Sequence, residues 1–68
     1  MVLNCSAVIG NPDEMKSFTE RLEELGIRPR VVGETVYVEY KGYNMTRFNS
    51  IVDAFEDKRR HTIDTHGA

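Results

Sequence analysis

Apolar and polar positions alternate over residues 2–9, which predicts a β-strand at the start of the chain. The side expected to face a core carries Leu3, Cys5, Ala7 and Ile9. The opposite side carries Val2, Asn4, Ser6 and Val8. This strand should therefore have one apolar face and one mixed face.

After residue 11 the apolar residues recur every three or four positions, which predicts a helix with one apolar stripe. The stripe consists of Met15, Phe18, Leu22 and Leu25. Asn11 is a favourable N-cap, and Pro12 suits the first helical position. Gly26 fits the left-handed residue that ends many helices. A helix over residues 12–25 is the expected result.

Two further strands are predicted over residues 27–32 and 35–41, joined by a type II′ turn at Gly33-Glu34. Pairing outward from this turn gives a core face made of Ile27, Pro29, Val31, Val36, Val38 and Tyr40. The other face is made of Arg28, Arg30, Val32, Thr35, Tyr37, Glu39 and Lys41. Proline has no N–H to donate, so the strand containing Pro29 is expected at a sheet edge.

A second helix is predicted after Asn44, its expected N-cap. Its apolar stripe consists of Met45, Phe48, Ile51, Val52 and Phe55. The basic residues Lys58, Arg59 and Arg60 are expected to close this helix, where positive charge suits the C-terminal end. Residues 62–65 are compatible with a short last strand or with a frayed tail.

The resulting order is β-α-β-β-α with an optional last strand, in the α+β class. It resembles the ferredoxin-like arrangement, with an antiparallel sheet and both helices packed on one face. Residues 1–61 are predicted to be a single domain, and residues 62–68 a short last strand or a flexible C-terminal tail. A chain of 68 residues buries only about 60% of its unfolded surface, so stability should be marginal or aided by self-association.

The composition excludes several classes of protein. A formal net charge of −2 argues against a grip on nucleic acid by the whole surface. A single cysteine excludes an intrachain disulfide and indicates a reducing compartment such as the cytoplasm. No segment approaches the roughly 20 apolar residues that span a bilayer, so no membrane partner is expected.

No catalytic or metal-binding motif is apparent. His61 and His66 are five positions apart, which differs from the four-residue spacing of a helical zinc pair. Cys5 is expected to be a small core residue, because no histidine lies near it in sequence to activate a thiolate. The chain is also too short to enclose a ligand pocket of about 300 Å³. We therefore expect no enzymatic activity and no cofactor.

The open face of the predicted sheet is the first candidate site, through Arg28, Arg30, Tyr37 and Lys41. One interpretation is a solvated face with a weak Arg28–Glu39 ion pair. A second is a protein interface, and a third is a surface that stacks single-stranded nucleic acid on Tyr37. The basic run of Lys58, Arg59 and Arg60 is the second candidate, either as a structural helix end or as a contact for an acidic partner or a phosphate.

The segment from Gly10 to Glu14 leads from the first predicted strand into the first helix. Together with the order of elements, Gly10 resembles the corresponding loop of ACT-type regulatory domains. That resemblance implies an amino-acid site near Gly10 in a dimer interface. A turn with a structural role alone is the other interpretation.

These patterns predict a small non-enzymatic protein-interaction or regulatory module that associates with itself or with another protein through its sheet. Single-stranded nucleic-acid binding on the open face is an alternative hypothesis. An ACT-like domain that binds a small ligand is the second alternative.

Overall fold

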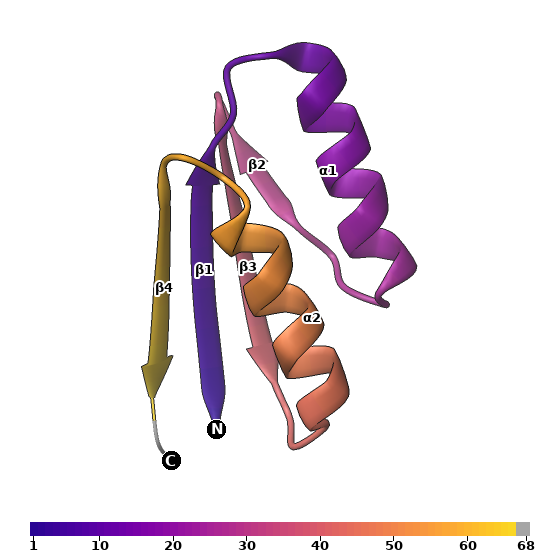
Figure 1. Ribbon diagram of the computed structural model, residues 1–68, viewed down its shortest axis with the longest axis vertical. Coiled ribbons are helices and arrows are strands. Elements are labelled where there is room, and N and C mark those ends of the chain that lie inside the picture. The colour runs from indigo at the N-terminus through magenta and orange to yellow at the C-terminus, as the bar shows by residue number, and fades with distance from the viewer. Residues whose placement is uncertain (67–68) are drawn as a thin grey trace.

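The computed structural model describes residues 1–66 as an α+β domain with one four-stranded antiparallel sheet and two helices (Figure 1). The elements are β1 (Val2–Val8), α1 (Pro12–Glu24), β2 (Arg30–Val32), β3 (Thr35–Lys41), α2 (Met45–Glu56) and β4 (His61–His66). The strands lie side by side in the order β2-β3-β1-β4. Both helices cover the same face of the sheet, which leaves the opposite face bare (Figure 1).

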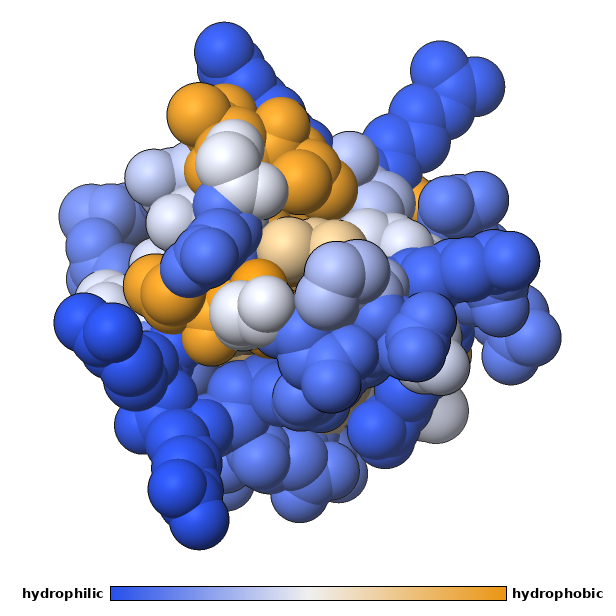
Figure 2. All heavy atoms as spheres, turned by 90° about the horizontal axis from the view of Figure 1, so that it is seen from above, coloured by the Kyte–Doolittle hydropathy of each residue, from blue (hydrophilic) through white to orange (hydrophobic). Residues whose placement is uncertain are grey.

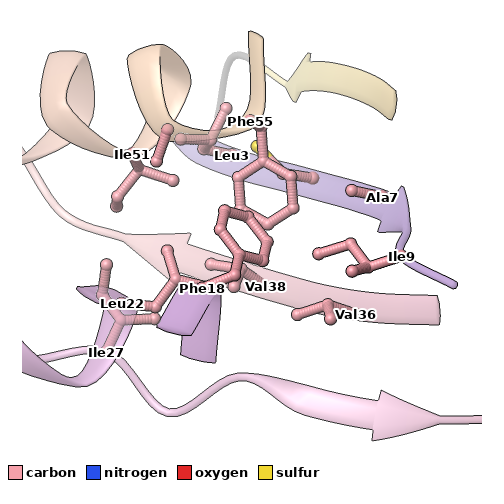
Figure 3. Packing of buried hydrophobic residues seen from close by; sticks show 12 residues of the cluster. Leu3, Ala7, Ile9, Phe18, Leu22, Ile27, Val36, Val38, Ile51 and Phe55 are labelled. Carbon is pink, nitrogen blue, oxygen red and sulfur yellow. The ribbon is translucent and has the colours of Figure 1, made fainter. Parts of the chain in front are cut away.

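The core lies between the helices and the inner face of the sheet (Figure 3). Phe18 of α1 and Phe55 of α2 meet edge to face, with ring centroids 5.0 Å apart. Such a pair contributes about 0.5–1.5 kcal/mol beyond the area it buries. The strands supply the alternate residues that the pattern predicted, which are Leu3, Cys5, Ala7, Val36 and Val38.

Local sequence explains where α1 begins and ends. The Asn11 side chain accepts hydrogen bonds from the backbone N–H groups of Asp13 (2.9 Å) and Glu14 (3.2 Å), as expected of an N-cap. Pro12 is the first helical residue. Gly26, just beyond the C-terminal end, has a φ of 81°, which confirms its predicted left-handed conformation.

The predicted turn is present, but β2 is shorter than predicted. Gly33 has a φ of 62°, and the turn sets the pairs Val32–Thr35, Val31–Val36 and Arg30–Tyr37. The expected pairing of residues 27–29 with β3 is wrong, because the strand begins only after Pro29, which has no N–H for a ladder. β2 is an edge strand as predicted, yet Val31, assigned to the core face, is 46% exposed there.

The second helix also departs from prediction at its end. It stops at Glu56, so Lys58, Arg59 and Arg60 lie in the turn before β4 and do not close a helix. The N–H of Lys58 donates to the carbonyl of Phe55 (3.0 Å), which tightens the last turn. The carbonyl of Arg60 accepts from the N–H of Val8 (2.9 Å), which draws the chain into the sheet. At the other end Met45 is 54% exposed and lies outside the core.

The last segment forms a strand. β4 pairs antiparallel with β1, with Cys5 opposite Ile63 and Ile63 turned toward the core. β4 thus covers the edge of β1, and the two outer strands of the sheet are β2 and β4. The rest of the predicted tail, residues 67 and 68, lies outside the described residues. Neither helix in residues 1–66 has the length and apolar character needed to cross a membrane.

Candidate functional site on the open face of the sheet

The open face is organised in rows, because residues paired across neighbouring strands point to the same side. The first row consists of Arg30, Tyr37, Ser6 and Thr62. The second consists of Glu39, Asn4 and Asp64. The third consists of Lys41, Val2 and His66. Each row runs from the β2 or β3 side of the sheet to the β4 side.

A shallow concavity of about 720 Å³ lies on this face. It brings together Arg28, Arg30 and Tyr37, three of the four residues that the sequence predicted for the site. The fourth, Lys41, lies one row further along the same face and is outside the lining. The concavity is open to solvent and lies on the face that the helices leave bare. It is not the enclosed ligand pocket that the chain was expected to be too short to form.

Side-chain size differs between the two central strands of this face. The β3 strand contributes large residues, and its Tyr37 is 46% exposed. The neighbouring β1 strand contributes the smaller Asn4 and Ser6, which line the same concavity. The concavity therefore has a floor of small residues on β1 and a raised wall on β3.

Charge is also distributed unevenly over this face. Glu39 pairs with Lys41 (3.4 Å), and Asp64 lies 3.0 Å from the His66 ring nitrogen. The predicted Arg28–Glu39 ion pair does not form, and within residues 1–66 neither Arg28 nor Arg30 has a carboxylate in ion-pair distance. The β2 side thus carries uncompensated positive charge, and the β4 side carries Asp64.

Sequence reasoning missed two residues of this site, Thr62 and Asp64. Both belong to residues 62–65, whose sequence is compatible with either a short strand or a frayed tail. The inward position of Ile63 between them is the signal that identifies them, because its two neighbours in a strand must then point outward.

A second hollow, of about 440 Å³, combines the two remaining candidates, Gly10 and the basic run. Within it Lys58 Nζ donates to Glu14 Oε1 (2.9 Å) and lies 4.9 Å from the centroid of the Phe18 ring. Lys58 is therefore engaged, whereas Arg59 and Arg60 are exposed. The N-terminal N–H groups of α1 are already capped by Asn11, which disfavours an anion near Gly10.

The other titratable candidates do not form a reactive centre. Cys5 is 4% exposed, and burial raises the pKa of its thiol to about 11, which disfavours the nucleophilic thiolate. His61 and His66 stand at opposite ends of β4. In residues 1–66 there is no group of three or more histidine, cysteine, aspartate or glutamate residues placed to hold a metal ion.

The chain matches no protein-family model, no curated protein and no solved structure in comparisons with each. The fold and the open face of its own sheet are therefore the basis for any statement about function.

Proposed function

We propose that this protein is a small non-enzymatic interaction module that self-associates through the open face of its sheet. The observation that carries this proposal is the concavity on that face, where Tyr37 stands beside Arg28 and Arg30 and opposite Asp64. Tyrosine and arginine are enriched at protein interfaces, because they combine large contact area with directional hydrogen bonds. Association would cover this half-exposed aromatic side chain.

The charges on this face favour a protein partner over nucleic acid. Affinity for nucleic acid comes from concentrated positive charge that neutralises phosphates. Here Glu39 and Asp64 share the face with Arg28 and Arg30, so the face carries charges of both signs and its positive charge is confined to one side. Single strands also bind on several stacked aromatics, whereas Tyr37 is the aromatic residue in the lining of this concavity.

Two finer assignments accompany this proposal. We assign the domain to the ferredoxin-like arrangement, supported by the β-α-β-β-α-β order and by the position of β1 between β3 and β4. We also place the protein in the cytoplasm, since its single cysteine suits a reducing compartment.

Sedimentation velocity over a range of about 5–500 μM tests the proposal. We expect the sedimentation coefficient to rise with concentration, and Tyr37→Ala to weaken association about tenfold or more, as for a central aromatic residue. Tyr43→Ala is the matched control, because Tyr43 is 86% exposed in the loop between β3 and α2.

A monomer at every concentration would overturn the proposal. Titration with random single-stranded DNA and RNA at low salt tests the main alternative. Binding that falls steeply with salt and is lost in Tyr37→Ala would establish nucleic-acid recognition in its place.

A further inference from the structure

We infer that the open face binds a second copy of this chain in one orientation, with a two-fold axis parallel to the strands. This inference rests on the proposed self-association and adds which residues meet. A symmetric dimer places the same surface of each copy against the other, so its contacts occur in reciprocal pairs. The distribution of charge and the distribution of side-chain size on the open face select the same axis.

Charge is the first argument. Arg28 and Arg30 mark the β2 side of the concavity, and Asp64 marks the β4 side. A two-fold axis parallel to the strands exchanges these sides and keeps the rows in register, so Arg30 of each copy lies over Thr62 of the other copy, one row from its Asp64. A two-fold axis across the strands would instead set arginine against arginine. Like charges brought together in an interface cost several kcal/mol.

Side-chain size is the second argument. Because β3 and β1 are the two central strands, the same axis lays β3 of one copy over β1 of the other. Tyr37 then meets Ser6 of the second copy, and Glu39 meets Asn4 of the second copy, since each pair shares a row. Large residues thus face small ones, as required for side chains to interdigitate between sheets about 10 Å apart. The Asn4 amide can also donate to the Glu39 carboxylate.

The dimensions of the face set the strength of the contact. Four strands about 4.8 Å apart, with about 3.4 Å per residue along a seven-residue strand, give a face of about 19 by 24 Å. Two such patches together cover about 900 Å², which is below the roughly 1,200 Å² of stable specific interfaces and in the range of weak, transient ones. The dimer should therefore form reversibly with concentration, and it should stop at two copies because the face is then fully used.

Exchange of charge between two variants tests the orientation. Arg30→Glu and Asp64→Arg are each expected to weaken self-association about tenfold, because each places like charges in adjacent rows on the same side of the interface. In an equimolar mixture the two new charges are opposite in sign and lie in adjacent rows on one side of the dimer, while an unchanged Arg30 and an unchanged Asp64 lie in adjacent rows on the other side. The mixture should recover association to within about threefold of the original protein. Arg47→Glu is the matched control, because Arg47 lies in α2 on the helical side of the sheet. This substitution should leave self-association unchanged.

A second measurement needs no substitution. In a mixture of isotope-labelled and unlabelled original protein, intermolecular nuclear Overhauser effects should connect the Tyr37 ring with the Ser6 β-protons of the other copy. If the protein dimerises but the mixture stays dissociated and these contacts are missing, the orientation is wrong and the proposed function stands. If the original protein never dimerises, the proposed orientation and the proposed function are both wrong.

Discussion

The two faces of the sheet are built from the same strands and obey different rules. On the inner face Leu3, Ala7 and Val36 are at most 1% exposed, and their neighbours in sequence on the outer face remain accessible to solvent. On the inner face, the effect of a substitution depends on the change in side-chain volume, because these residues fill the space beneath two helices. Charge and side-chain size decide what the outer face can bind. Substitutions on the two faces should therefore change different measurable properties.

The largest expected effect is on the inner face, at Phe55. Phe55→Ala should lower the free energy of unfolding by about 3–5 kcal/mol, because it removes the buried ring that packs on Phe18 and leaves a cavity. Urea denaturation followed by circular dichroism measures this loss. Tyr37→Ala, measured at a concentration where the chain is monomeric, should cost less than about 1 kcal/mol. Equal losses of unfolding free energy in Phe55→Ala and Tyr37→Ala would show that the two faces do not differ in their contribution to stability.

An intermediate effect is expected from pH, through Cys5. Burial raises the pKa of this thiol from 9.0 to about 11, so the folded protein holds the proton more tightly than the unfolded chain. The resulting stabilisation is fully present below pH 9 and is lost as the pH rises toward 11. By linkage the loss approaches about 2–3 kcal/mol above pH 11.

Urea denaturation at pH 7–10.5 tests this effect, with Cys5→Ala as the control. The difference in unfolding free energy between the two proteins should narrow as the pH rises above 9. A constant difference over that range would show that the thiol is accessible to solvent in the folded state.

The smallest effect concerns the turn that sets which residues lie on which face. Gly33→Ala should cost about 1–2 kcal/mol, because φ is 62° and a β-carbon disfavours that conformation. No atom lies within 4 Å of the position of an added β-carbon, so the cost is confined to the backbone. Gly33→Asn should cost less, since asparagine tolerates this region better. If alanine and asparagine are equally costly in urea denaturation, the backbone conformation is not the cause.

Local signals in the sequence were sufficient for much of this fold. Asn11, Pro12 and Gly26 identified the ends of α1, and the Gly33-Glu34 turn correctly identified three residue pairs between β2 and β3. Those signals act over a few residues of chain, where backbone geometry and side-chain chemistry determine the outcome directly.

Elements that depend on distant contacts were predicted less well. Beyond the end of α2 at Glu56, the chain is joined to β1 by the hydrogen bond from the Val8 N–H to the Arg60 carbonyl, a contact that no local pattern reveals. The strand at residues 61–66 depends on pairing with β1 at the other end of the chain. For that reason Asp64, which determines the charge of one side of the open face, was missing from the predicted site.

The pairing of β1 with β4 has a consequence for the order of folding. It brings Val2 beside His66, whereas the β2–β3 hairpin closes over only two residues. Closing a long loop carries a greater entropic cost and takes longer than forming a short hairpin. β4 is therefore the strand expected to join the sheet last and to leave it first. The last step of folding, in which β4 pairs with β1, is then also the step that places Asp64 on the open face.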